Sequence, residues 1–101
     1  AGGYSNEIGT GGIATVVGGG WFNTATSQFA VIAGGRFNSN SGFSGTTGGG
    51  DYNTVAAMYG VIAGGYSNDN NGFAGTISGG YTAPAHPGMV AHAPRNGCVY
   101  L

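Results

Sequence analysis

The chain has 101 residues, of which 24 are glycine and 5% are charged, and its formal net charge is −1 at pH 7. With no lysine and two arginines it has too little positive charge to neutralise a phosphate backbone, so we expect no nucleic-acid partner. The chain is 41% hydrophobic, which argues against a disordered tract, and it has no run of about 18 apolar residues, so we expect no membrane insertion by this segment.

From the N-terminus onward, one motif recurs: two glycines, two variable residues and an asparagine. The five complete copies end at Asn6, Asn23, Asn38, Asn53 and Asn68. The first two asparagines are seventeen positions apart and the later ones fifteen, so the first unit carries two extra residues, which we expect at Gly9 to Gly11. A sixth copy, Gly79-Gly80, has Ala83 in place of the asparagine. Self-similarity at a fixed short period is typical of stacked repeat architectures.

The glycine pairs mark one corner of each unit. We expect them to supply the positive φ angles of a tight reversal, which side chains would disfavour. The repeated asparagine tolerates such a corner and can hydrogen-bond neighbouring backbone, so stacked copies would form a ladder of amide hydrogen bonds. The glycines that share this structural role with the five asparagines are Gly19, Gly20, Gly34, Gly35, Gly49, Gly50, Gly64 and Gly65.

Each unit also has a short apolar run just before the next glycine pair. The equivalent positions of these runs are predicted to form one inward-facing column, Val17, Ile32, Thr47, Ile62 and Ile77. A second level of repetition is visible, because units two and four end in aromatic-small-Val-Ile-Ala whereas units three and five share Gly-Phe-small-Gly-Thr. The true period is therefore either a single unit or a pair of units. Helices are excluded by the glycine density and by the lack of apolar residues at helical spacing.

These patterns predict an all-β fold, a parallel β-solenoid of about six 15-residue rungs over residues 1–83, followed by a terminal cap or loop segment over residues 84–101. Rungs stacked about 4.8 Å apart would give a rod about 25 to 30 Å long. A 15-residue rung encloses a narrow interior, so aromatic and apolar side chains remain outside, where partner chains would cover them.

The Gly-Gly-x-x-Asn units, over residues 2–83, resemble the head repeats of trimeric autotransporter adhesins of the YadA type and the related β-roll repeats of bacteriophage tail fibres. Residues 91–100 are similar to the closing segment that follows such arrays in many tail-fibre-like proteins. The resemblance implies a left-handed β-roll, a homotrimer, and an extracellular, cell-surface or virion location where the module attaches to a host or another surface. Because no heptad stalk or membrane anchor follows the repeats, a fragment or a small virion subunit is expected.

Aromatic residues follow the glycine pairs at two adjacent corner positions. Such a stripe could stack on the sugar rings of a surface glycan or a host receptor, or it could be covered by a neighbouring subunit. We favour the structural role, because aromatic area dominates the energetics of interfaces. The candidate ligand-binding residues of the stripe, which also contains Tyr4 and Phe22, are Trp21, Phe37, Tyr52, Tyr66 and Tyr81.

Few residues carry reactive chemistry. The three acids, Glu7, Asp51 and Asp69, fall in different rungs, so no carboxylate pair is expected. Equivalent positions place Asp51 beside Arg36 of the adjacent rung, which predicts a surface ion pair.

The remaining candidates lie in the last segment. His86 and His92 are interpreted as loop or packing residues, with a metal site on a three-fold axis as the less favoured alternative. Cys98 is interpreted as a buried small hydrophobe rather than a nucleophile. We therefore predict no catalytic residue, no metal, no cofactor and no enzymatic activity.

The leading functional hypothesis is a structural or adhesive module of a trimeric fibre, a virion tail fibre or a cell-surface adhesin head. The alternative is a purely structural spacer or virion component without a ligand. Ice binding by an ordered hydroxyl array is less favoured, because the threonines do not fall into one uninterrupted column of the predicted stack.

Overall fold

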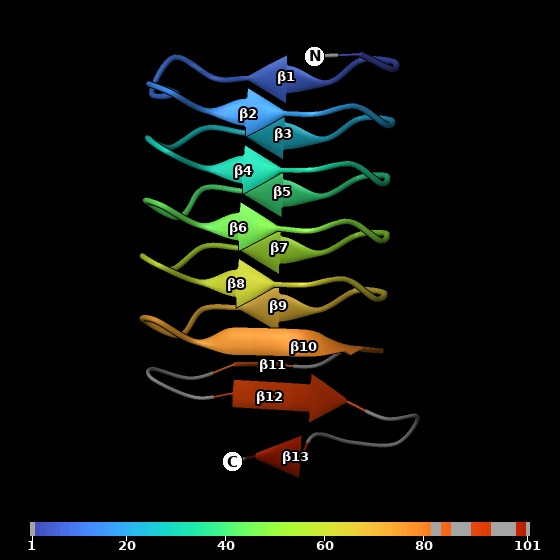
Figure 1. Cartoon of the computed structure of the whole chain (residues 1–101), viewed down its shortest axis with the longest axis vertical. Coiled ribbons are helices and arrows are strands. Elements are labelled where there is room, and N and C mark those ends of the chain that lie inside the picture. The colour runs from blue at the N-terminus through green and yellow to red at the C-terminus, as the bar shows by residue number, and fades with distance from the viewer. Residues whose placement is uncertain (1, 82–83, 86–89, 94–98, 101) are drawn as a thin grey trace.

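The computed structural model describes residues 2–81, 84–85, 90–93 and 99–100. Over these residues the chain is a β-solenoid of about five turns, with two parallel sheets in stacked coils and no helix (Figure 1). The molecule measures 33 × 22 × 12 Å, so the coil is flattened, with two broad sides and two narrow edges. The prediction of an all-β parallel solenoid is confirmed.

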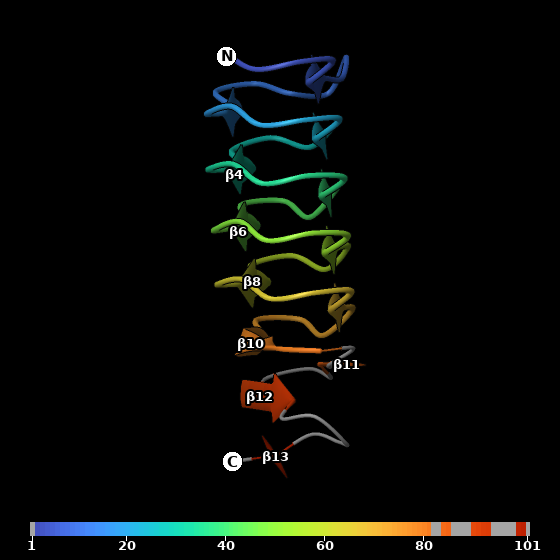
Figure 2. The ribbon, with the colours of Figure 1, turned by 90° about the vertical axis from the view of Figure 1, so that its right-hand side faces the viewer.

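Each full turn contributes one short strand to each sheet, and the two sheets lie on opposite sides of the coil (Figure 2). The first sheet contains, in order, β1 (Glu7–Ile8), β3 (Thr24–Ala25), β5 (Ser39–Asn40), β7 (Thr54–Val55), β9 (Asp69–Asn70) and β11 (Pro84–Ala85). The second sheet contains, in order, β2 (Val16–Val17), β4 (Val31–Ile32), β6 (Thr46–Thr47), β8 (Val61–Ile62), β10 (Thr76–Gly80), β12 (Val90–Ala93) and β13 (Val99–Tyr100). All neighbours are parallel except β12 and β13, which are antiparallel.

The strand register fixes the length of one turn. Val16 of β2 pairs with Val31 of β4, fifteen positions further along the chain, and the same step separates β3 from β5. Glu7 of β1, however, pairs with Thr24 of β3, seventeen positions further along. The two extra residues of the first unit therefore lie between β1 and β2, an interval that contains the predicted positions 9–11.

From β2 to β10, the second residue of each strand points into the interior, whereas Ile8 of β1, at the end of the coil, is exposed. In the second sheet these side chains are at most 2% exposed and form the predicted inward column, Val17, Ile32, Thr47, Ile62 and Ile77. Within this column the hydroxyl oxygen of Thr47 is buried without a hydrogen-bond partner. The predicted core column is confirmed, with one polar atom in it that the fold does not satisfy.

The inward positions of the first sheet explain the two-unit pattern. They alternate between Ala25 or Val55 and a buried asparagine, Asn40 or Asn70. The Asn70 side chain accepts a hydrogen bond from the backbone N–H of Gly72 (3.2 Å) and donates to the carbonyl oxygens of Val61 (3.0 Å) and Gly75 (2.7 Å).

The buried asparagines also explain a glycine that recurs in alternate turns, at positions 42 and 72. The backbone N–H of Gly42 donates to Asn40 Oδ1 (3.2 Å), and a Cβ on Gly42 would collide with the carbonyl oxygen of Ala57 in the next turn. A Cβ on Gly45 would lie 2.5 Å from Asn40 Oδ1 and 2.9 Å from Val55 Cγ1, so a side chain there would displace both neighbours. Units three and five therefore keep glycine at both positions around their buried asparagine. One turn corresponds to a single unit of the sequence, and two successive turns form the larger repeat.

Asparagines also hold the corner that follows the glycine pair, as predicted. The Nδ2 group of Asn38 donates to the carbonyl oxygens of Gly34 (3.1 Å) and Gly50 (2.8 Å), and its Oδ1 accepts the backbone N–H of Asn53 (2.9 Å). The backbone N–H of Asn38 in turn donates to Asn23 Oδ1 (3.0 Å). Asn23, Asn53 and Asn68 make equivalent side-chain bonds to two glycine carbonyls, and Asn23 and Asn53 also accept the backbone N–H of the next ladder asparagine. Each side chain therefore joins its own turn to the next, and the backbone N–H joins the residue to the turn before.

The two glycines of the pair Gly34-Gly35 have different roles, which corrects the prediction that both glycines of every pair supply positive φ; in the pair Gly49-Gly50 both angles are positive, at +157° and +86°. Gly35 has φ of +92°, and a Cβ there would collide with the carbonyl oxygen of Gly50. Gly34 is outside the positive-φ region, and a Cβ there would meet nothing within 4 Å. The second left-handed residue of the corner is instead an aromatic, Phe37, with φ of +54°. Stacking against neighbouring turns therefore holds this bulky residue in a conformation that it disfavours by about 1–2 kcal/mol.

Candidate functional site: two aromatic ladders

The predicted aromatic stripe occupies one edge of the coil. Parallel bridges join Tyr4, Trp21, Arg36, Asp51, Tyr66 and Tyr81 into one column, one residue per turn. The next residue of each turn forms a second column, Ser5, Phe22, Phe37, Tyr52 and Ser67, whose members are all left-handed. Of the five candidate binding residues, Trp21, Tyr66 and Tyr81 lie in the first column, and Phe37 and Tyr52 lie in the second. We call the aromatic residues of both columns ladder one: Tyr4, Trp21, Phe22, Phe37, Tyr52, Tyr66 and Tyr81.

The rings of ladder one stack on one another along the axis. Phe37 stacks on Phe22 with ring centroids 5.2 Å apart, and on Tyr52 with centroids 4.9 Å apart, and both pairs are within 8° of parallel. Tyr66 and Tyr81 stack in the same manner at 5.2 Å, and Tyr52 contacts Tyr66 edge to face at 5.9 Å. Equivalent rings of successive parallel turns are held near the strand spacing, which produces this offset stacking.

Stacking limits which of these rings can receive a ligand. A sugar ring packs on the face of an aromatic ring, but both faces of Phe37 are turned toward other rings. Trp21 differs, because it is 56% exposed and contacts Tyr4 only in a tilted arrangement, with centroids 6.0 Å apart and planes at 51°. Trp21 therefore has more ring face available for a ligand than Phe37 has.

Arg36 and Asp51 interrupt the first column of ladder one. Arg36 Nη2 lies 2.5 Å from Asp51 Oδ2, and Nε lies 3.2 Å from Oδ1, so the predicted ion pair is confirmed and is bidentate. The hydrogen bond from Arg36 lowers the pKa of Asp51 below its ordinary value; desolvation opposes this shift, and the charge of Arg36 adds to it. Because the pair is exposed, its contribution to stability is small.

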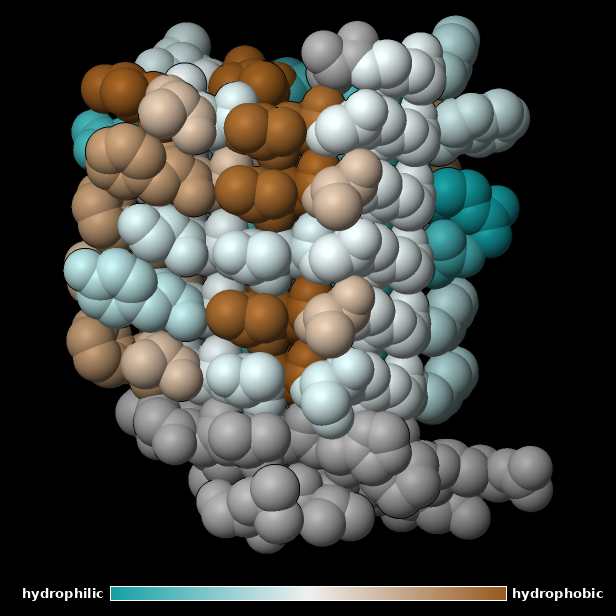
Figure 3. Space-filling view, viewed as in Figure 1, coloured by the Kyte–Doolittle hydropathy of each residue, from teal (hydrophilic) through white to brown (hydrophobic). Residues whose placement is uncertain are grey.

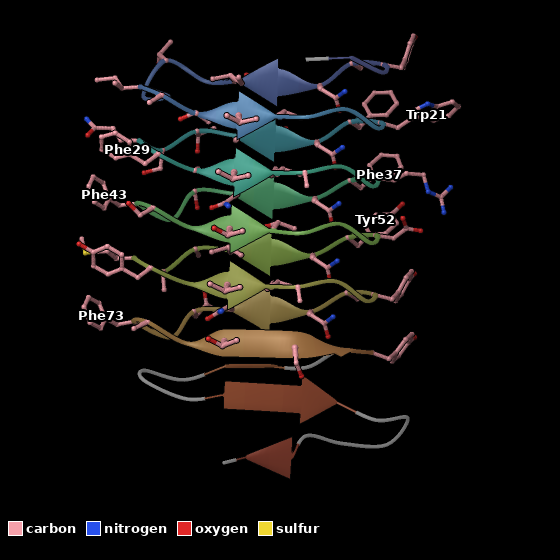
Figure 4. The ribbon with its side chains drawn as sticks, in the orientation of Figure 1. Trp21, Phe29, Phe37, Phe43, Tyr52 and Phe73 are labelled. Atoms are coloured by element: carbon pink, nitrogen blue, oxygen red, sulfur yellow. The ribbon has the colours of Figure 1, made fainter. Side chains whose placement is uncertain are left out.

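A second aromatic ladder lies on the opposite edge, where the sequence analysis did not place a site (Figure 4). We call its members, Phe29, Phe43, Tyr59 and Phe73, ladder two. Successive rings are nearly perpendicular, at 84° to 87°, with centroids 5.6 to 6.1 Å apart. The signal for this ladder is present in the sequence, because successive members are alternately one position closer and one position further apart than one full turn.

The alternating spacing of ladder two follows from two neighbouring columns. Phe29 and Tyr59 occupy the left-handed column, where Ser44 stands in the turn between them. Phe43 and Phe73 occupy the column immediately before it. Each of the four turns after the first therefore presents one ring, from alternate columns, and this displacement allows edge-to-face contacts in place of parallel stacking.

The two broad sides of the coil differ in polarity. On the second sheet the outward column is Val16, Val31, Thr46, Val61 and Thr76. Figure 3 shows hydrophobic side chains along the centre of this side, interrupted by paler, more polar ones. On the first sheet the outward column is Glu7, Thr24, Ser39, Thr54 and Asp69. Its three hydroxyl-bearing residues occupy successive turns, and an acidic residue lies in the turn beyond each end, Glu7 before them and Asp69 after them.

The other chemical candidates are separated. Glu7 and Asp69 share one column of the first sheet but have three residues between them, and Asp51 is at the edge. Among the described residues no three His, Cys, Asp or Glu side chains could share a metal ion, no pocket indents the surface, and no helix could cross a bilayer. His86 and Cys98 lie outside the described residues, and of His92 only the backbone, in β12, is described.

The fold and its surface define a β-solenoid repeat protein with exposed aromatic edges. The sequence matches no protein-family model, and it matches no curated protein and no solved structure.

Proposed function

We propose that this chain is a structural, rod-forming module of an oligomeric fibre, with an adhesive role at one edge. The full form of the proposal is a left-handed β-roll of about six rungs that associates as a trimer in a virion tail fibre or a cell-surface adhesin head. The resemblance of the Gly-Gly-x-x-Asn repeats to such proteins supports the handedness, the trimer and the extracellular setting.

The observation that carries the proposal is the amount of aromatic surface left in water. The rings of ladder one are 41% to 62% exposed. Taking about 200 Å² for a whole aromatic side chain, ladder one alone exposes about 700 Å². The largest apolar patch on a typical monomer is about 300–600 Å² and is often functional, and stable partners each contribute about 800 Å² to an interface. A surface of this size favours a protein that works in contact with another molecule.

The hydrogen-bond pattern supports a role in setting length and rigidity. Each ladder asparagine binds its own turn and both neighbours, so the corner is satisfied without any external group. Each further turn would lengthen the rod by about 4.8 Å with the same bonds. This regularity is what a spacer requires, and it supports the purely structural alternative as well as the adhesive one.

We assign the adhesive role to Trp21 and the polar corner next to it. Trp21 has an accessible ring, and Arg36 in the next turn of the same column supplies hydrogen-bond donors. An indole face beside a guanidinium is a common arrangement for binding sugars and anionic groups. For Phe37 and Tyr52 we propose a structural role within the chain, because their rings stack on each other.

The test has two measurements on the whole chain. Light scattering coupled to size-exclusion chromatography should give three times the mass of one chain, and a stable monomer at high concentration would refute the fibre module. Glycan-array binding that disappears in Trp21→Ala but persists in Phe37→Ala would support the adhesive role. A trimer that binds no surface would reject the adhesive role and support the purely structural spacer.

A third candidate, ice binding, has one observation in its favour. Thr24, Ser39 and Thr54 form a regular hydroxyl column on a flat sheet. Because the column is bounded by Glu7 and Asp69, the array covers only three turns. Absence of thermal hysteresis would end this idea.

A further inference from the structure

One broad side and one edge of the coil together form a continuous surface that carries no charge. We call it the apolar side; it consists of the outward column of the second sheet and ladder two, namely Val16, Val31, Thr46, Val61, Thr76, Phe29, Phe43, Tyr59 and Phe73. In each turn the ladder-two ring precedes the outward strand residue by only two or three positions, as Phe29 precedes Val31. The edge and the face are therefore adjacent (Figures 3 and 4).

Charge is distributed unequally around the coil. Among residues 2–81, Glu7 and Asp69 point outward from the first sheet, and Arg36 and Asp51 lie in ladder one's first column. None lies on the apolar side. Charged residues are depleted in the centres of protein interfaces, because burying them there costs free energy. The apolar side therefore has the composition of an interface core, and the opposite broad side has that of a solvated surface.

Small residues make the apolar side flat. Beside the outward column of the second sheet runs another exposed or half-exposed column with no side chain larger than serine, Gly18, Ala33, Gly48, Ala63 and Ser78. A sheet face that carries β-branched and small residues lets a second sheet approach to about 10 Å with its side chains interdigitated. The molecule's second sheet thus has the shape that sheet-on-sheet packing requires.

The size of the surface matches what a stable assembly needs. The broad side is at most 33 × 22 Å, or about 700 Å². Three rings of ladder two are 47% to 55% exposed, and they add about 300 Å² on the basis of about 200 Å² per whole ring. A standard interface buries about 800 Å² on each partner.

The periodicity of the surface identifies the partner. In the left-handed column of ladder two, large Phe29 and Tyr59 alternate with small Ala14, Ser44 and Ala74. The rings of Phe43 and Phe73, from the neighbouring column, fill the turns between, so ladder two is a continuous row of rings whose pattern repeats every two turns, or about 10 Å. The outward column of the second sheet has the same two-turn alternation, Val31, Thr46, Val61 and Thr76, so a partner that contacts every turn equally must have this turn length and this alternation. Another copy of this chain has that repeat.

We infer that copies of this chain associate through the apolar side, so that the second sheets and ladder two lie inside the assembly, and that ladder one and the first sheet remain on the outside. This inference rests on the proposed oligomeric fibre and assigns its interface. It also leaves Trp21 accessible on the assembled rod.

The test compares two matched double variants of the whole chain by sedimentation or light scattering across a range of concentrations. Val31→Lys with Val61→Lys places charges on the apolar side, whereas Thr24→Lys with Thr54→Lys places them at the equivalent outward, half-buried positions of the first sheet. We expect the valine variant to raise the dissociation constant by about 100-fold or more, because unpaired charges would be buried. The threonine variant should keep the mass of the unmodified protein.

A second pair of variants covers the case in which lysines on a strand prevent folding. Phe29→Ser with Tyr59→Ser introduces the residue that the chain already has at position 44, and Phe22→Ser with Tyr52→Ser introduces the residue found at positions 5 and 67 of the same column. Only the first of these should dissociate, with circular dichroism confirming that both remain folded.

The outcomes separate the two proposals. An oligomer that persists in the ladder-two and valine variants, or that dissociates equally in the control variants, overturns the assigned interface while the fibre module stands. If the unmodified chain is a monomer at every concentration, both the fibre module and this interface are rejected.

Discussion

Substituting alanine for each glycine of one pair tests whether the two glycines have different roles at the corner. Gly35→Ala places a methyl group at φ of +92°, where the Cβ would collide with the carbonyl oxygen of Gly50 and lie 2.6 Å from Asn38 Nδ2. That carbonyl accepts hydrogen bonds from the backbone N–H of Arg36 (2.9 Å) and from Asn38 Nδ2 (2.8 Å). Gly34→Ala is the matched control, because a Cβ there would meet nothing within 4 Å and the residue is not left-handed.

The expected loss of stability in Gly35→Ala follows from these contacts. A left-handed alanine costs about 1–2 kcal/mol, and weakening two hydrogen bonds costs about 1 kcal/mol each. We therefore expect Gly35→Ala to lower the free energy of unfolding by about 3–4 kcal/mol, and to lower the melting temperature by about 15–25 °C for a chain of this size. Gly34→Ala should change stability by less than about 1 kcal/mol, and a slight stabilisation is expected because alanine restricts the unfolded chain.

The assay is thermal and urea unfolding followed by circular dichroism, at one protein concentration for all variants, because any self-association would contribute to the measured stability. Equal effects of the two substitutions would contradict the division of roles within the glycine pair. A Gly35→Ala protein as stable as the unmodified chain would show that the turns are not packed as closely as the structure has them.

Three further predictions concern single polar groups. Asn53→Asp removes the N–H donors to two glycine carbonyls and places a carboxylate against them, which raises the pKa of that carboxylate in the folded state. We expect the free energy of unfolding to fall by several kcal/mol at pH 7. This loss should recover as the pH falls toward the unfolded pKa of about 3.9, measured by unfolding at several pH values. Thr47→Val removes the buried, unpaired hydroxyl and should stabilise the fold by about 1 kcal/mol, while Thr47→Ser, which keeps the hydroxyl and loses the methyl group, should destabilise it. Asp51→Asn should be less stable than the unmodified chain at neutral pH and equally stable at low pH. The reason is that a lowered folded pKa contributes stability above the ordinary pKa of Asp51, and this stability is lost as the pH falls through the folded pKa. A difference in unfolding midpoint that stays constant with pH would contradict the ion pair with Arg36.

Much of this fold could be predicted because the coils stack in register, so residues one period apart in the sequence become neighbours in space. Once one turn equals one sequence unit, Ile32 and Ile62 must share a column and Arg36 must lie beside Asp51. The same rule applies to the asparagine ladder. These predictions needed only residue spacing and the tendency of like side chains to stack.

Other features could not be predicted from the sequence because they depend on local backbone geometry. Both glycines of a pair look alike in sequence, and only the left-handed angle and the close approach of the next turn separate Gly35 from Gly34. Ladder two was missed because Phe29 and Phe43 occupy neighbouring columns, so a search at a strict one-turn spacing does not align them. The interpretation of His86 and Cys98 remains a prediction, since both lie outside the described residues.

The alternation of neighbouring turns has an evolutionary consequence. Val55 Cγ1 reaches the space above Gly45 in the turn before it, and Asn40 fills the same column one turn earlier. Deleting a single turn would bring together two turns of the same type and break this interlock. Deleting or duplicating two turns together would restore every contact, so genes of this kind should grow and shrink in units of two turns, and the rods they encode should differ in length by steps of about 10 Å.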